Sequence, residues 1–138
     1  MDRAALDAGL RYGIAVGGWC PAGRRAEDGQ IPERYPLEEL DSPDYAARTE
    51  KNVVAADATL ILNFGLLADG TKLTVRLARK NRKPYLVVQL DGDADPATVA
   101  VWIRALGVRV LNIAGPRESK RPGVYACALR FVQKLLEE

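Results

Sequence analysis

The stretch ATLILNF, residues 58–64, decides the fold of this chain. It is apolar at nearly every position, so both of its faces must be covered by other parts of the protein. Strands in the centre of a parallel sheet show this near-continuous apolarity, whereas half-exposed strands alternate with polar residues. The stretch therefore predicts a central parallel strand between layers of helices.

Strands and helices alternate outward from this stretch. Further strands are predicted at 84–90 and 108–114, with helices at 71–81, 95–107 and 124–136. Ahead of it, Ser42 is expected to cap a helix that has Pro43 at its first position and runs through Val54. Repeated strand–loop–helix units with right-handed crossovers give a parallel sheet covered on both faces. The predicted class is α/β, a three-layer α/β/α arrangement with a mainly parallel sheet.

The first part of the chain carries a different signal. Residues 2–12 predict a helix with a small-residue face, and Gly13 follows in the usual place for a left-handed cap. A short buried strand is expected at 14–18. A long loop rich in proline and glycine then runs to about Pro36.

The composition limits the classes of partner. The 138 residues fit one domain, residues 1–138, and 48% hydrophobic residues are enough for a core. The net charge of +2 comes with scattered basic residues, so we expect no nucleic-acid partner. No apolar run is long enough to span a bilayer and no export signal opens the chain, so we expect no membrane partner and a cytoplasmic location.

Histidine is absent and only two cysteines occur, Cys20 and Cys127. Nucleophile systems that depend on histidine are therefore excluded, as is a tetrahedral zinc site. We expect no metal ligand from the protein. Any acid–base chemistry would fall to Asp, Glu, Lys, Tyr or Cys.

The loops that follow the strands are the expected ligand edge, because parallel sheets bind ligands at the carboxyl ends of their strands. At Gly70-Thr71 a glycine permits close backbone approach and a helix start attracts an anion, although a plain helix cap is the alternative. Arg24 and Arg25 suit an oxyanion clamp or a solvated loop. We expect a phosphorylated or otherwise anionic small molecule here. The candidate residues are Gly17, Gly18, Arg24, Arg25, Gly70, Thr71, Thr74, Arg117 and Ser119.

Several motifs resemble the molybdenum carrier family. They are GGWCP at 17–21, GRRAEDG at 23–29, RTEKNV at 48–53, Gly70-Thr71 and GPRES at 115–119. That family is similar to the Rossmann-like group that includes the Lonely-Guy (lysine-decarboxylase-like) phosphoribohydrolases. The resemblance implies a Rossmann-like domain, a homo-oligomer, and a pocket for molybdenum cofactor, molybdate or, alternatively, a nucleotide.

The chain departs from these patterns in two places. The family usually begins with a strand and a Gly-Gly-Gln-Thr-Gly-Val-Asp turn, of which only the following segment is present at 2–7, so we expect the domain to lack its first strand. A truncated sequence or a start codon assigned too late would explain this. Lonely-Guy enzymes carry Gly-Gly-X-Gly-Thr-X-X-Glu, and Thr74 stands at the position of the glutamate. This favours binding without hydrolysis and leaves open whether the chain is an enzyme.

Three functions therefore remain open on the sequence. The first is a carrier of molybdenum cofactor or a related anion. The second is a nucleotide hydrolase, in which Glu27, Asp28 or Glu118 would supply the acid or base. The third is a nucleotide sensor without turnover, which would need the same phosphate-binding groups as the carrier.

Overall fold

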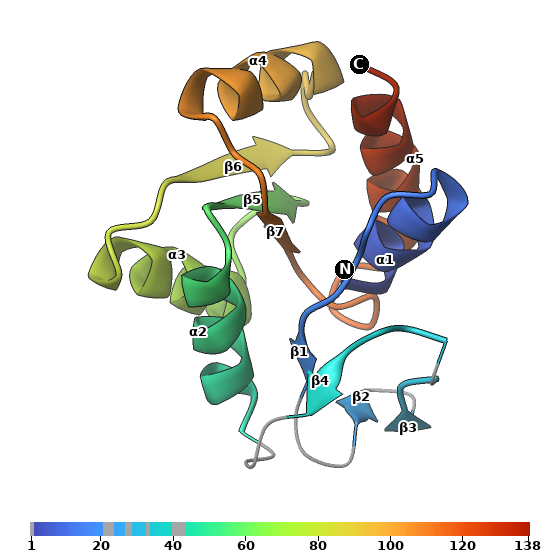
Figure 1. The fold of residues 1–138 in the computed structure, drawn as a ribbon, viewed down its shortest axis with the longest axis vertical. Helices are drawn as coiled ribbons and strands as arrows, with labels where there is room; N and C mark the ends of the chain where they lie inside the picture. Colours follow the sequence, from blue (N-terminus) through green and yellow to red (C-terminus); the bar gives the residue numbers. More distant parts are fainter. Residues whose placement is uncertain (1, 21–23, 27–28, 33, 40–43) are drawn as a thin grey trace.

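The computed structural model describes residues 2–20, 24–26, 29–32, 34–39 and 44–138. Its helices and strands follow one another in a single series (Figure 1). They are α1 (Asp2–Arg11), β1 (Trp19–Cys20), β2 (Arg25–Ala26), β3 (Gly29–Gln30), β4 (Glu38–Glu39), α2 (Tyr45–Ala55), β5 (Ala58–Asn63), α3 (Asp69–Lys80), β6 (Tyr85–Gln89), α4 (Pro96–Leu106), β7 (Leu111–Ala114) and α5 (Val124–Leu136).

The main sheet confirms the prediction made from residues 58–64. Its strand order is β6-β5-β7, and both pairings are parallel. Every residue of β5 is buried, as expected of a central strand. Figure 1 shows α2 and α3 on one side of the sheet and α4 and α5 on the other. The fold is therefore a small Rossmann-like α/β/α arrangement.

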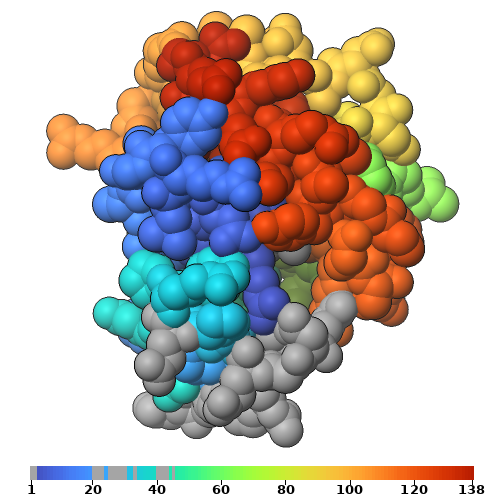
Figure 2. All heavy atoms as spheres, turned by 90° about the vertical axis from the view of Figure 1, so that its right-hand side faces the viewer, coloured from blue at the N-terminus to red at the C-terminus, as the bar shows by residue number. Residues whose placement is uncertain are grey.

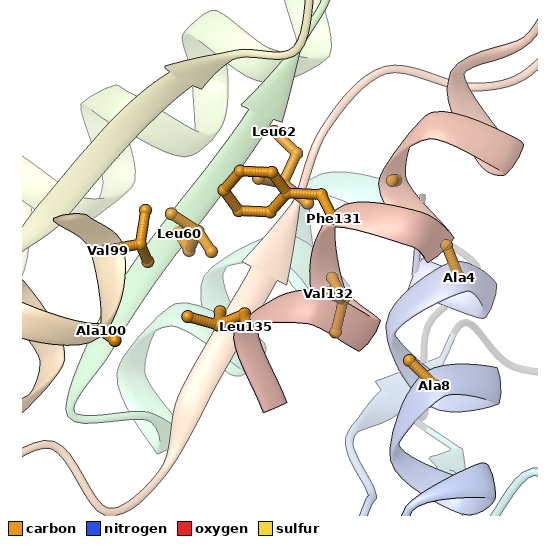
Figure 3. Close-up of a cluster of buried hydrophobic side chains, with 10 residues drawn as sticks. Ala4, Ala8, Leu60, Leu62, Val99, Ala100, Phe131, Val132 and Leu135 are labelled. Carbon is orange, nitrogen blue, oxygen red and sulfur yellow. The ribbon is translucent and has the colours of Figure 1, made fainter. Parts of the chain in front are cut away.

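The core lies mainly between β5 and the helices α4 and α5. Alternate side chains of β5 point to opposite faces, and Leu60 and Leu62 belong to the cluster on the α4 and α5 side. Phe131 reaches from α5 toward these two leucines (Figure 3). The small residues Ala4 and Ala8 let α1 pack against α5 on the outside of this layer.

The helix boundaries follow the local sequence. The carboxylate of Asp95 accepts a bond of 3.0 Å from the amide of Ala97, and Pro96 begins α4. Gly107 ends that helix in the left-handed conformation, with φ +64°. Helix α2 begins at Tyr45 with Asp44 as its cap. The predicted start at Ser42 and Pro43 lies outside the described residues.

The predicted buried strand at 14–18 is wrong. Its residues form no regular strand, and Ile14 is half exposed. The amide of Ile14 still bonds to the carbonyl of Gly9, at 2.9 Å, so the start of this run belongs to the end of α1. The strand that follows is the two-residue β1, which pairs with β4 in parallel. An apolar run this short does not specify strand pairing on its own.

The strand predicted at 108–114 begins three residues later, at Leu111. The carboxylate of Asp57 accepts bonds of 2.9 Å from the amides of both Arg109 and Val110, so these residues turn around the start of β5. The amide bonds, that of Val110 first, lower the pKa of Asp57. These two amides therefore donate to the Asp57 carboxylate, whereas the prediction had placed them in a strand.

The long loop from Gly18 to Pro36 contains short pairings. Strands β2 and β3 form an antiparallel pair.

In the part of the chain that the structure describes, no helix is long and apolar enough to cross a membrane.

Candidate functional site

Five residues separate the end of the central strand from the start of helix α3. Its N-cap, Ala68, has no oxygen in its side chain, and no other side chain of the described part caps it. Helices α2 and α4 are instead capped by Asp44 and Asp95, and Glu118 accepts from two amides at the start of α5. The first amides of α3 therefore have no side-chain cap, while the carboxylate of Asp69 in its first turn offsets part of the positive charge at this helix end.

Two threonines lie buried in the first turns of α3, and they differ in their hydrogen bonds. Thr74 donates its hydroxyl to the carbonyl of Gly70, at 3.1 Å. Thr71 is 3% exposed, and its Oγ1 has no hydrogen-bond partner among the described residues. A buried polar atom without a partner costs about 1–3 kcal/mol. Of the two, Thr71 has the hydroxyl available for a ligand.

Gly70 leaves open space at the exposed surface of the start of α3. A Cβ placed at Gly70 would meet no described atom within 4 Å. Its backbone is ordinary helix, so the glycine is not needed for a positive φ. No described contact requires a glycine here, and a glycine permits close approach of another molecule to the backbone.

The loop between β5 and α3 is held from outside. Arg121 donates from Nε to the carbonyl of Phe64 and from Nη2 to that of Leu66, both at 3.1 Å. The carboxylate of Asp91 accepts from the amide of Gly65, at 3.2 Å. This arginine was not predicted, because nothing in its own surroundings in the sequence indicates that it reaches back to residues 64–66.

Asn63 ends the central strand and is fully buried. Its Nδ2 donates to the carbonyl of Gly65 at 2.8 Å and to Oε1 of Gln89 at 3.3 Å. Its Oδ1, like the hydroxyl of Thr71, has no partner in the described part of the chain. Asn63 was missed as a site residue, although a polar residue that ends an apolar strand was a usable signal.

A shallow groove of about 480 Å³ runs along the outer face of α3. Lys72 and Arg76 line it together with the carboxylate of Asp69. Thr71 faces the protein interior and does not line it. The two positive charges of Lys72 and Arg76 outnumber the one negative charge of Asp69, so the net charge around the helix start favours an anion.

Gly17 and Gly18 lie in a second groove, of about 270 Å³. The same groove is lined by Val110, Leu111 and Asn112, at the start of β7. The structure thus places the two glycines beside the beginning of a strand, whereas Gly70 and Thr71 follow the end of one. Their role in ligand binding stays a prediction.

Asn52 and Lys51 of α2 hold the backbone and ring of Trp19 beside these glycines. The amide of Trp19 donates to Oδ1 of Asn52 at 2.8 Å, and Nδ2 of Asn52 donates back to its carbonyl at 3.2 Å. The ammonium of Lys51 lies 4.7 Å from the centre of the indole ring. Trp19 therefore has partners within the protein for both its backbone and its ring.

Arg24 is engaged by its own loop. Its guanidinium donates to four carbonyl oxygens at 2.9–3.2 Å, and its φ is +54°. Four of its five N–H donors are thus used inside the protein. This geometry favours a role in holding the loop, and the predicted oxyanion clamp is not tested. The acceptors are the carbonyls of Ile31, Pro32, Tyr35 and Leu37. The side chain of Arg25 lies outside what the structure describes.

The remaining candidates lie mostly in the loop before α5. Arg117 and Ser119 are exposed there. The amides of Tyr125 and Gly123 bond to the carboxylate of Glu118 at 2.8 and 2.7 Å and lower its pKa. That carboxylate is thus engaged in helix capping, which makes it a poor general base. The other predicted acids, Glu27 and Asp28, lie outside the described residues.

A carboxylate between two tyrosines ties the long loop to the helices. Tyr35 is 1% exposed and donates its hydroxyl to Asp7 Oδ1 at 2.8 Å, and Tyr125 donates to Asp7 Oδ2. Arg34 donates to the hydroxyl of Tyr35, at 3.0 Å. Figure 2 shows the segment that carries Tyr35, in cyan, directly below α1, in blue, with α5 in red beside it. This network fixes the far side of the loop that Arg24 holds.

The comparisons with known proteins agree with this fold. Residues 1–136 match the model of the circularly permutated YpsA SLOG family. The chain belongs to this SLOG family. A similar solved structure comes from Syntrophus aciditrophicus SB, with 41% identity and a TM-score of 0.90 over 97% of this chain and 87% of that chain. That protein is named "Putative molybdenum carrier protein". No curated protein matches the sequence.

Within this SLOG family member, no group of three or more His, Cys, Asp or Glu side chains could hold a metal ion in the described ranges. The described candidates at the start of α3 are backbone amides and the hydroxyl of Thr71. Such groups suit an oxyanion better than a bare metal cation.

Replacing Tyr125 by phenylalanine in this SLOG protein should lower the free energy of unfolding by about 1 kcal/mol, because a hydrogen bond to a half-buried carboxylate is lost. The bond to Asp7, and then burial, raise the pKa of Tyr125 from 10.0 to about 12. The stability from this shift is fully present below pH 10 and is lost as the pH rises toward 12. Urea unfolding on both sides of pH 10 should show a weaker alkaline loss in the variant.

Tyr12→Phe is the matched control, since Tyr12 and Glu137 directly follow the ends of the same two helices and bond to each other on the exposed surface. A smaller effect of Tyr12→Phe than of Tyr125→Phe is expected. Equal effects would contradict a special role for Asp7.

Proposed function

We propose that this chain is a binding protein for a phosphorylated or otherwise anionic small molecule, held at the start of α3. One observation carries the proposal. Thr71 has a buried hydroxyl with no partner in the described structure, in the first turn of a helix that no described side chain caps. A ligand oxyanion would accept from this hydroxyl and from the first amides of the helix.

Molybdenum cofactor fits this proposal by its phosphate. The amides of Gly70 and Thr71, with the Thr71 hydroxyl, would hold that group beside the open space at Gly70. The cofactor's dithiolene supplies the sulfur ligands of the metal, so none need come from the protein. The name of the Syntrophus aciditrophicus protein supports a ligand that contains molybdenum. A nucleotide presents the same phosphate chemistry and is the alternative.

The assignment to Thr71 is testable by Thr71→Val, which keeps the shape and removes the hydroxyl. Affinity for an anion should fall about tenfold, the effect of one hydrogen bond to a charged group. Stability should not fall, because the hydroxyl lost has no partner in the unliganded, described structure. Calorimetric titration with inorganic phosphate, molybdate and adenosine monophosphate measures the first effect, and thermal unfolding measures the second.

Thr74→Val is the matched control on the same helix. The hydroxyl of Thr74 already donates to Gly70, so its removal should leave affinity within about twofold of the parent protein. The proposal is wrong if none of the three ligands gives a saturable heat. It is also wrong if Thr74→Val weakens binding and Thr71→Val does not.

A further inference from the structure

The orientation of the Asn63 amide is fixed by its two donor bonds. Both of its partners, the carbonyl of Gly65 and Oε1 of Gln89, are acceptors at 2.8 and 3.3 Å. The nitrogen must therefore face them, and the oxygen must be the atom that has no partner in the described structure. Asn63 thus offers a buried acceptor and no further donor at this place.

The unmet groups at the two ends of the loop 64–68 are complementary. At its far end, the amides of α3 and the hydroxyl of Thr71 are donors that suit the oxygens of an anion. At its near end, the free oxygen of Asn63 would repel an unprotonated oxyanion oxygen and accept from an O–H group. The loop backbone offers little else, since Arg121 and Asn63 already bind its carbonyls at 64–66.

We propose that Asn63 Oδ1 accepts a proton carried by the bound anion, so that this site selects protonated oxyanions over fully ionised ones. The inference rests on the proposed anion site at α3. The ligand class it names is a phosphate that retains an O–H, in preference to sulfate or free molybdate. A phosphate monoester, such as that of molybdenum cofactor or a nucleotide, would then bind in its singly protonated form, although its second pKa is about 6.

Inorganic phosphate and sulfate provide the closest comparison. They are similar in size and shape, but at neutral pH every phosphate ion carries at least one proton and sulfate carries none. Phosphate is no more negatively charged than sulfate. Tighter binding of phosphate would therefore come from its proton and not from charge attraction.

The test is calorimetric titration of the parent protein with phosphate, sulfate and molybdate at neutral pH and constant ionic strength. Phosphate should bind about tenfold more tightly than either of the others, the effect of one buried hydrogen bond. In Asn63→Leu, which lacks the acceptor, the three affinities should approach one another. Gln89→Met keeps the Asn63 oxygen and its bond to Gly65, so it should keep the preference.

The outcomes separate this inference from the proposed function. Equal affinity for the three anions in the parent protein would overturn the role of Asn63 and leave the anion site standing. Absence of binding for all three and for adenosine monophosphate would overturn both. Because the ranking is measured in the parent protein, it decides the matter even if Asn63→Leu does not fold.

Discussion

The variant Gly70→Asp should be slightly more stable than the parent protein and yet bind anions about 100-fold more weakly. A carboxylate in the first turn stabilises a helix by about 0.3–1 kcal/mol, and replacing a helical glycine adds a similar amount. The structure has room for the new side chain, since a Cβ at Gly70 meets no described atom within 4 Å. The carboxylate would occupy the place proposed for the ligand and would repel it. Thermal unfolding and phosphate titration measure the two effects.

Ala97→Asp is the matched control for this variant. Ala97 is exposed at the second position of α4, the place that Gly70 occupies in α3. The Ala97→Asp variant adds the same charge at an equivalent helix position and should leave phosphate affinity unchanged. Parent-like affinity in Gly70→Asp would contradict the site, and an equal loss in Ala97→Asp would point to a non-specific charge effect.

Replacing Arg24 by methionine should lower the free energy of unfolding by about 2–4 kcal/mol. The guanidinium makes four hydrogen bonds to loop carbonyls, and bonds to charged groups contribute about 1.5–3 kcal/mol each without full additivity. Methionine keeps much of the length and apolar stem of the side chain but supplies none of these donors. Urea unfolding measures the loss, and limited proteolysis shows whether the loop opens.

Arg82→Met provides the control for Arg24→Met. Arg82 also has a positive φ, of +53°, but its side chain is exposed. Its replacement should change stability by less than about 0.5 kcal/mol. If Arg24→Met weakened anion binding without loss of stability, Arg24 would be the oxyanion clamp that the sequence suggested.

The main sheet was predictable because its signals are local. Residues 58–64 are apolar on both faces, and only the centre of a parallel sheet covers such a strand in this way. The start of α4 at Asp95-Pro96 and its end at Gly107 follow equally local rules of capping. These elements needed no knowledge of their neighbours.

The errors in the fold arose where a distant residue decides the local structure. Residues 108–110 look like the start of a strand, but Asp57, some fifty positions earlier, takes their amides. Ile14 looks like a buried strand residue, but its amide completes the end of α1. Short apolar runs carry too little information to exclude such partners.

Part of the candidate site could likewise be predicted from local sequence, and part depends on distant residues. Gly70 and Thr71 could be named because a glycine and a hydroxyl at a helix start have a local physical meaning. Which of the two threonine hydroxyls is available for a ligand depends on the helix backbone. The hydroxyl of Thr74 donates to the carbonyl of Gly70, and that of Thr71 does not. The bonds of Arg24 depend on the return of the chain at 31–37, and those of Arg121 on the loop at 64–66. No spacing of residues in the sequence predicts these contacts.

The central claim, an anion site at the start of α3, is tested most directly by an amide chemical-shift titration with inorganic phosphate. The account predicts saturable shifts that are largest at Asp69, Gly70 and Thr71 and absent from the start of α4. Saturable shifts centred on Gly17 and Gly18, or on the loop before α5, with α3 unaffected, would contradict it.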